Sequence, residues 1–287
     1  MNFRVLTPVH ISSGQILTKY EFIIKGSKFQ FYSFDEIINY IDSKKNAESL
    51  FKFGLEGFFK HHNLNIKPTY EIPFHGRPKD KVYEFIKLGN KVYIPGSSIK
   101  GAIRTAYLYK MIKNDNNLRS KFLELIRSRN FRDFYNFYRD IEKKIDDTFR
   151  KILISDSEFF KPSDCLKVVE IKHKNLSLAI EVLRENFEFK IDIKFMDNNL
   201  KNQVDNAISE FSKDLVNYLK SIGIYNSLTN LENKKLIRLG RFKGYFSNTI
   251  MLILFYFDKN LYEKYKKRTF WKTINDQPLG FCEVSFD

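Results

Sequence analysis

Cysteine, proline, glycine and long apolar runs are scarce in this chain, and their scarcity excludes several classes of protein. The two cysteines, Cys165 and Cys282, lie far apart with no second Cys or His at metal-ligand spacing, so the sequence indicates neither a zinc site nor a disulfide framework. The longest apolar run, residues 249–257, is too short to cross a bilayer, and residues 3–6 resemble a strand, not an export signal. We therefore expect a soluble protein of the reducing cytoplasm with no membrane partner.

Acidic residues are also in deficit. The chain of 287 residues has 34 Asp and Glu against 49 Lys and Arg, which gives a formal net charge of +15. Because the basic residues recur along the whole chain, an acidic partner is favoured, and nucleic acid is the first candidate. The hydrophobic share of 43% provides enough core material to fold without a metal or disulfides. On charge alone, a basic structural or ribosome-associated protein is an alternative.

Residues 93–107 are the most informative segment, because they predict a strand end, a tight turn and a helix start. Pro95 and Gly96 mark the turn, while Lys100 and Arg104 are four residues apart and project from one helical face. Helix N-termini attract anions through unpaired N–H groups and the helix dipole. The residues that we predict to meet a phosphate backbone here are Gly96, Ser97, Ser98, Lys100, Gly101 and Arg104.

The same segment has a simpler interpretation. Ser97 or Ser98 can cap the helix, and a capped surface helix with two solvated basic residues would show this pattern without any ligand. A P-loop is excluded, because no Gly-Lys-Ser/Thr follows Gly96 at the required spacing. Nucleotide hydrolysis is therefore disfavoured.

Two other segments combine flexible backbone with polar or basic side chains. Residues 7–14 leave the first expected strand through a loop that contains Ser and Gly. In residues 236–249, the aromatic Phe242 and Tyr245 lie among glycines and cations. Contact with single-stranded RNA requires this combination of flexible backbone, positive charge and aromatic faces. A glycine hairpin with a solvated basic tip is the alternative for the second segment. The candidate RNA-binding residues in these segments are His10, Ser12, Ser13, Gly14, Arg238, Gly240, Arg241, Lys243 and Gly244.

The remaining pattern predicts a mixed chain of strands and helices. Residues 105–150 are helical and basic, with interleaved aromatic residues that either form a nucleic-acid face or pack inward. Residues 67–81 contain three prolines and predict a loop or linker. We expect an N-terminal part, 1–150, with a helical insertion around 110–150, and a C-terminal part, 151–287. The other expected strands are 3–9, 20–25, 28–32, 82–94, 151–159, 166–173, 188–195 and 281–286, and the other expected helices are 33–61 and 200–222.

Taken in order, segments 7–14, 93–104 and 239–244 resemble the RAMP superfamily of CRISPR RNA-binding proteins. Pro-Gly-Ser-Ser-Ile-Lys-Gly with a following Arg is typical of RAMP subunits in type III effector complexes. The opening residues 6–11 and the ending residues 278–281 are similar to the family that caps the 3′ side of the guide RNA in type III-A, or Csm, complexes. The resemblance implies an α+β fold of ferredoxin-like (RRM-like) units, one or two in tandem, with helical insertions.

The resemblance also implies partners and residue roles. The partners would be crRNA, the repeated Csm backbone RAMP subunit, the small helical Csm subunit and, in addition, target RNA. By position, Ser97, Ser98, Lys100 and Arg104 would touch phosphates or ribose, and residues 240–244 would form the glycine-rich loop of the family. The equivalent capping subunit of type III-B (Cmr) complexes shares the middle motif and is an alternative.

Evidence for catalysis is weak. His10 is the histidine closest to an expected RNA loop and would serve a repeat-processing endoribonuclease, but a lone histidine at a strand end is more often structural. Asp156 and Glu158 alternate onto one face of an expected strand, where two acids are far more often solvated than metal-bound. We therefore predict a non-catalytic binding subunit with no catalytic residue, metal or cofactor.

Overall fold

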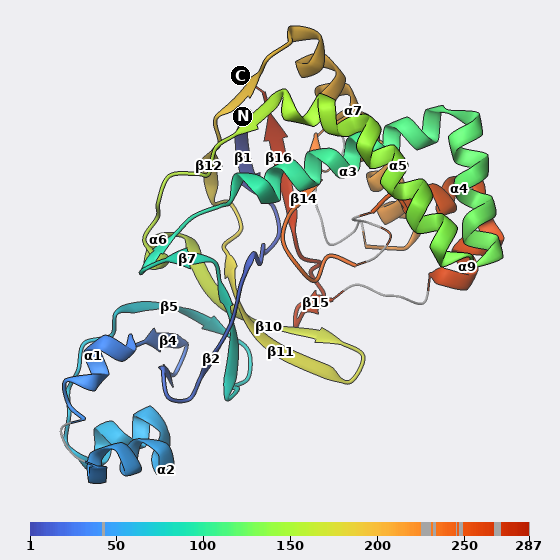
Figure 1. Ribbon diagram of the computed structural model, residues 1–287. Coiled ribbons are helices and arrows are strands. Elements are labelled where there is room, and N and C mark those ends of the chain that lie inside the picture. The colour runs from blue at the N-terminus through green and yellow to red at the C-terminus, as the bar shows by residue number, and fades with distance from the viewer. Residues whose placement is uncertain are drawn as a thin grey trace.

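Two β-sheets carry the fold, and strands from distant parts of the chain meet in the smaller one (Figure 1). The computed structural model describes residues 1–41, 44–224, 231, 234–244, 246, 249–266 and 271–286. The smaller sheet is antiparallel, and its strands in spatial order are β12 (Glu188–Lys190), β1 (Asn2–Val5), β16 (Phe281–Ser285) and β14 (Leu236–Arg238). Helices α3 (Gly96–Asn114) and α7 (Asn198–Ser221) pack against each other and against β14.

The larger sheet is mixed. The pairs β5–β10 and β6–β11 are parallel and the other pairs are antiparallel. Its main path is β2 (Ser12–Thr18), β6 (Lys81–Phe85), β11 (Leu176–Leu183), β10 (Leu166–His173), β5 (Tyr70–His75), β4 (Lys28–Phe31) and β3 (Phe22–Lys25), and β15 (Lys272–Thr273) also pairs with β10. Two short pairs join β7 (Lys87–Leu88) to β8 (Lys91–Val92) and β9 (Ile152–Ile154) to β13 (Ile193–Phe195).

The expected helical region after residue 105 is confirmed as the remainder of α3 followed by α4 (Asn116–Ser128) and α5 (Phe131–Arg150). Asp115 caps α4 and Asn130 caps α5 through side-chain hydrogen bonds, as their short polar side chains favour. Phe122 is fully buried, and Arg127 pairs with Asp258, so inward packing explains part of the aromatic and basic pattern. The remaining helices are α1 (Phe34–Ile38), α2 (Lys44–His61), α6 (Pro162–Cys165), α8 (Leu252–Phe257) and α9 (Lys259–Tyr265).

Several strand predictions need correction. Residues 67–81 are not a simple loop, because they contain β5; its ladder with β10 uses Phe74 and His75, so Pro73 need not donate a hydrogen bond there. The expected strand 188–195 is divided into β12 and β13, which belong to different sheets. The expected strand 151–159 is confirmed only as the three residues of β9. Strand β11 was not expected.

The predicted boundary at residue 150 does not separate two sheets. Both the smaller and the larger sheet combine strands from either side of residue 150, since β1 pairs with β16 in the first and β5 pairs with β10 in the second. The elements β3, β4, α1 and α2 form a lobe at the lower left of Figure 1 with a small core of its own, built from Ile23, Tyr32, Ile37, Leu50, Leu55, Phe58 and Phe59. Among helices of the described residues, none combines the length and hydrophobicity that crossing a bilayer requires.

Candidate nucleic-acid interface

Helix α3 begins at Gly96, immediately after the Pro95 turn. The Gly96 N–H donates to Asp156 Oδ1 at 2.7 Å. The residue at the N-cap position is Pro95, so the expectation that Ser97 or Ser98 caps the helix is wrong. A Cβ at position 96 would lie 2.4 Å from the carbonyl oxygen of Ser155, so a glycine is needed for the chain after β9 to cross the helix start. Asp156 thus satisfies a helix terminus, and it lies in a loop, not in a strand.

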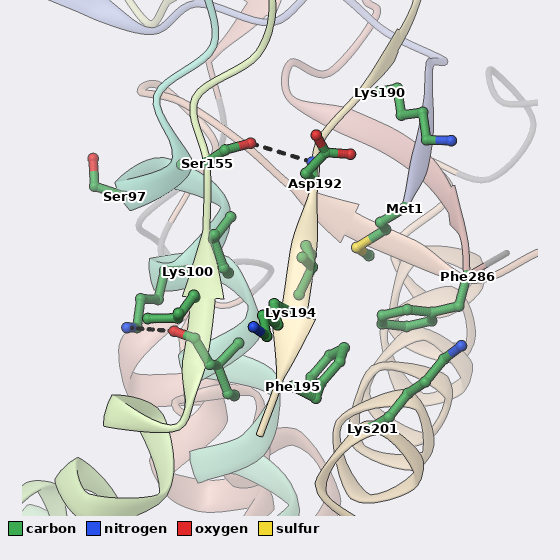
Figure 2. A pocket seen from close by; sticks show the side chains of 15 residues that line it. Met1, Ser97, Lys100, Ser155, Lys190, Asp192, Lys194, Phe195, Lys201 and Phe286 are labelled. Atoms are coloured by element: carbon green, nitrogen blue, oxygen red, sulfur yellow. Dashed lines mark hydrogen bonds between the residues drawn. The ribbon is translucent and has the colours of Figure 1, made fainter. Parts of the chain in front are cut away.

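A groove, which we call the α3 groove, opens between this helix start and strands β9 and β13 (Figure 2). Its volume is about 890 Å³. Lysines are its main charged residues, and Asp192 is the one acid among the residues that line it. The lining residues are Met1, Gly96, Ser97, Lys100, Ile152, Leu153, Ile154, Ser155, Lys190, Asp192, Ile193, Lys194, Phe195, Lys201 and Phe286.

The two cations of the predicted motif have different surroundings. Lys100 lines the α3 groove and its Nζ donates to the carbonyl oxygen of Ile152 at 2.9 Å. Arg104, one turn further, pairs with Glu142 at 3.4 Å and with Asp146 at 2.8 Å, both on α5. The expected shared cationic face is therefore divided: Lys100 lies at the groove, whereas Arg104 joins α3 to α5. Gly101 is exposed, and a Cβ there would meet nothing within 4 Å.

The segments 7–14 and 239–244, predicted separately as loops, lie against each other and against residues 279–281; we call this contact the glycine junction. The Arg241 N–H donates to the carbonyl oxygen of His10 at 2.8 Å, and the Gly280 N–H donates to that of Pro8 at 2.8 Å. Gly240 has φ +80, and a Cβ there would lie 2.1 Å from the His10 oxygen. The glycine at 240 is therefore required both by its backbone conformation and by this close approach.

Exposed polar groups of the glycine junction come from both segments. Arg241 is exposed, and its Nη1 lies 3.3 Å from Ser12 Oγ. The ladder between β2 and β6 shifts register between Ser12 and Ile16, so the part of the expected loop from Ser12 onward is a bulged strand, whereas residues 7–11 lie outside the named strands. Ser13 accepts from the backbone of Gln15, and Gly14, with φ +91, is exposed. Gly244 also has a positive φ, of 84°, whereas Tyr245 lies outside the described residues.

Two predicted RNA-binding cations point into the protein interior. Arg238 is only 2% exposed, with its guanidinium 4.1 Å above the Phe281 ring, and it donates to the Leu279 carbonyl. Burial lowers the pKa of Arg238 to about 9. Lys243 Nζ donates to the Arg238 carbonyl at 3.0 Å, and burial, aided by the Arg238 charge, lowers the pKa of Lys243 to about 7. In this conformation neither side chain is presented to a ligand.

His10 is fully buried beneath the glycine junction. Its Nδ1 lies 2.7 Å from the carbonyl oxygen of Glu181, and its ring lies between Phe85 and Phe242. Burial lowers the pKa of His10 to about 4, so the ring is neutral near pH 7. The Glu181 carboxylate is itself buried and accepts hydrogen bonds from Tyr70, from the Phe85 N–H and from Lys87. His10 thus supports the junction from inside, and its ring is out of reach of a 2′-hydroxyl.

The α3 groove and the glycine junction lie at opposite ends of the same two strands. Met1 and Phe286, which flank β1 and β16, line the groove, whereas the other ends of these strands enter the junction through the hydrogen bond from the Leu6 N–H to the Phe281 carbonyl. Strands of four and five residues place the two sites about 15 Å apart. One pair of neighbouring strands therefore connects all three motifs that the sequence singled out.

A model of the RAMP superfamily matches residues 2–249. The chain belongs to the RAMP superfamily. Among curated relatives, it is 25% identical over 245 residues to the CRISPR system Cms protein Csm5 of Streptococcus thermophilus, covering 74% of this chain and 67% of that protein. It is also 25% identical over 226 residues to the protein of the same name from Methanocaldococcus jannaschii, covering 69% of this chain and 53% of the relative.

Solved structures have the same fold. The crystal structure of T. onnurineus Csm5 superimposes with a TM-score of 0.71 at 19% identity, covering 99% of this chain and 100% of that one. A chain in the cryo-EM structure of a Csm-crRNA-target RNA ternary complex of a type III-A CRISPR-Cas system gives a TM-score of 0.73 at 20% identity, with 99% of each chain covered. Within the RAMP superfamily, this protein is therefore Csm5-like, and its mixed α+β fold agrees with the expectation.

Sequence analysis identified only Gly96, Ser97 and Lys100 among the fifteen residues that line the α3 groove. It did not find Phe195, Phe286, Lys194 or Lys201, which come from two strand ends and a helix start far from residue 96. A signal was present for some of them, because in residues 188–195 the exposed Lys190 and Lys194 alternate with buried or half-buried apolar residues. Such alternation identifies an exposed face, but not what lies opposite it.

Proposed function

We propose that this RAMP-superfamily protein is a non-catalytic crRNA-binding subunit of a type III-A (Csm) interference complex. In this role it caps the 3′ side of the guide RNA, contributes to crRNA maturation and acts in the cytoplasm in antiviral defence. Its partners are crRNA, the Csm backbone RAMP subunit, the small helical Csm subunit and target RNA. The likeness to Csm5 supports the assignment to the complex, and the ferredoxin-like (RRM-like) character of the fold, in one or two units, belongs to the same proposal.

The observation that carries the proposal is the α3 groove. Lys100, Lys190, Lys194 and Lys201 line it against one carboxylate, Asp192. A concave site with such an excess of cations attracts a polyanion, and each phosphate that it neutralises releases counterions and adds salt-dependent affinity. The helix start contributes less than the sequence predicted, because Asp156 already accepts from the Gly96 N–H.

Residue roles follow from the exposures. In the proposal, Ser97, Ser98, Lys100 and Gly101 meet the RNA backbone at the α3 groove, and Ser12, Ser13, Gly14 and Arg241 meet it at the glycine junction. Arg104 would join them only by exchanging Glu142 and Asp146 for a phosphate. The other predicted residues support this surface from within or beside it, and they are His10, Gly96, Arg238, Gly240, Lys243 and Gly244.

His10 is not proposed as a catalytic residue. A general base must come within hydrogen-bond reach of the hydroxyl it deprotonates, and this ring is fully buried. The competing endoribonuclease function predicts that the purified protein cuts repeat RNA and that His10→Gln abolishes cutting. Observed His10-dependent cleavage would therefore overturn the non-catalytic proposal.

The proposal is tested by purifying the tagged protein from its own cells and sequencing the RNA and proteins that accompany it. Mature crRNA with other Csm subunits is the expected result. Cmr subunits in their place would assign the protein to a type III-B complex, and bulk ribosomal RNA would favour the basic structural alternative. The double variant Lys100→Ala/Lys194→Ala should recover less crRNA, while the control Lys25→Ala/Lys81→Ala, exposed lysines of the larger sheet, should recover as much as the wild type.

A further inference from the structure

Two phenylalanine rings line the α3 groove beside its lysines. Phe195 ends β13 and Phe286 follows β16, and their ring centroids lie 6.0 Å apart with an interplanar angle of 54°. Both rings are half-buried, so each keeps a face or an edge open to the groove. Figure 2 shows them between β13 and the start of α7, with Lys201 next to Phe286.

The groove therefore has two chemical halves. One half presents Ser97 and Lys100 of α3 with Lys194 on the same side of β13, and the other presents the two aromatic rings with Lys201 next to Phe286. A volume of about 890 Å³ lies within the range of pockets that enclose small organic groups. A ligand that fills both halves needs an anionic part and a flat apolar part.

We propose that the α3 groove takes an unpaired base of single-stranded RNA, which stacks on one ring of the Phe195–Phe286 pair and meets the other ring with its edge, while Lys201 beside the rings and Lys194 across β13 hold the neighbouring phosphates. The inference rests on the proposed function, because it assumes that the groove is the RNA site, and it adds the form of RNA that the site accepts. Bases of a duplex are stacked on one another and expose only their edges, whereas bases of a single strand turn outward onto aromatic side chains. The aromatic half of the groove therefore selects single strands, and the lysines alone do not.

Base stacking is sequence-tolerant, because every base has a flat π-face. The site should accordingly bind strands of different sequence with similar affinity, as expected for a subunit that must hold many different guides. Removing an aromatic side chain on which a base stacks should lower the affinity about 5- to 150-fold per base. The phosphate contacts set the salt dependence separately.

The experiment measures binding of a fluorescent, non-self-complementary RNA of mixed sequence to the full chain at several salt concentrations. Phe195→Leu/Phe286→Leu keeps apolar volume but removes both rings, and it should weaken single-strand binding at least 5-fold with an unchanged salt slope. The matched control is Tyr135→Leu, which removes an aromatic residue that is 65% exposed on α5, and its affinity should equal that of the wild type. Thermal midpoints of all variants verify that they fold.

A duplex of the same sequence separates stacking from charge. It should bind the wild type and the phenylalanine double variant equally, because it meets only the lysines. Unchanged single-strand affinity in a folded double variant would overturn the stacking site while leaving the proposed function intact. Absence of RNA binding by the wild type would overturn both. Phenylalanine-dependent binding of polyglutamate in place of RNA would assign the groove to an acidic protein partner and also refute the inference.

Discussion

Replacing Gly240 with Ala should destabilise the protein more than the same change at three other glycines of the predicted site. A Cβ at position 240 adds two costs: the positive φ of 80° is strained by roughly 1–2 kcal/mol, and overpacking against the His10 carbonyl, 2.1 Å away, costs roughly 1–3 kcal/mol. The expected loss is thus about 2–5 kcal/mol. At Gly14, where φ is +91 and the surrounding space is open, only the first cost applies.

The other two glycines complete the comparison. Gly96 has no positive φ but would place a Cβ 2.4 Å from the Ser155 oxygen, so Gly96→Ala carries only the packing cost. Gly101 has neither problem and is an exposed position within α3, so Gly101→Ala should stabilise the protein by about 1 kcal/mol. Urea denaturation of the four variants measures the order. Equal stabilities for Gly240→Ala and Gly14→Ala would refute the close approach at the glycine junction.

Three further outcomes are expected. Because burial lowers the pKa of His10 from 6.5 to about 4, the unfolded chain binds this proton first as the pH falls, and His10 alone should account for a loss of about 3 kcal/mol in the free energy of unfolding between pH 7 and pH 4. A His10→Gln variant with the same pH slope as the wild type would contradict this. Asp156→Ala should cost about 1 kcal/mol in urea denaturation by uncapping α3, and Asp156→Asn should cost less. Lys100→Ala/Lys194→Ala should reduce the log–log salt slope of RNA binding by about two units, and an unchanged slope would remove both lysines from the interface.

The segments of the candidate site could be located in the sequence, because turn and glycine residues mark them locally. Pro95 and Gly96 mark a turn in any surroundings, and Gly240 needs a conformation that few other residues adopt, so both segments could be recognised without knowing the fold. The helices after residue 105 were also predictable, because their apolar period and the caps at Asp115 and Asn130 are local features.

Whether an individual basic side chain is buried, paired or exposed could not be predicted in this way. Arg238 and Arg241 are three residues apart and look equivalent in sequence, yet one is buried over Phe281 and the other is exposed. Arg104 was expected to be available, but its partners Glu142 and Asp146 lie on another helix. In each case the deciding neighbour is about 40 residues away, and periodicity carries no information about it. The strand β5 was missed because the three prolines of residues 67–81 predicted a loop, although only Pro73 lies within the strand.

The pairing of β1 with β16 has a consequence for the order of folding. Residues Phe3 and Val284, which lie opposite each other in that pair, are separated by most of the chain, whereas β3 and β4 join through a two-residue turn. Closing the long loop costs about 3 kcal/mol more chain entropy than closing a ten-residue hairpin. The hairpins and helices should therefore form first and the smaller sheet late. Met1 and Phe286, which flank β1 and β16, line the α3 groove. The proposed RNA site should therefore form only in the last steps of folding, and partly folded chains should not compete with the native protein for RNA.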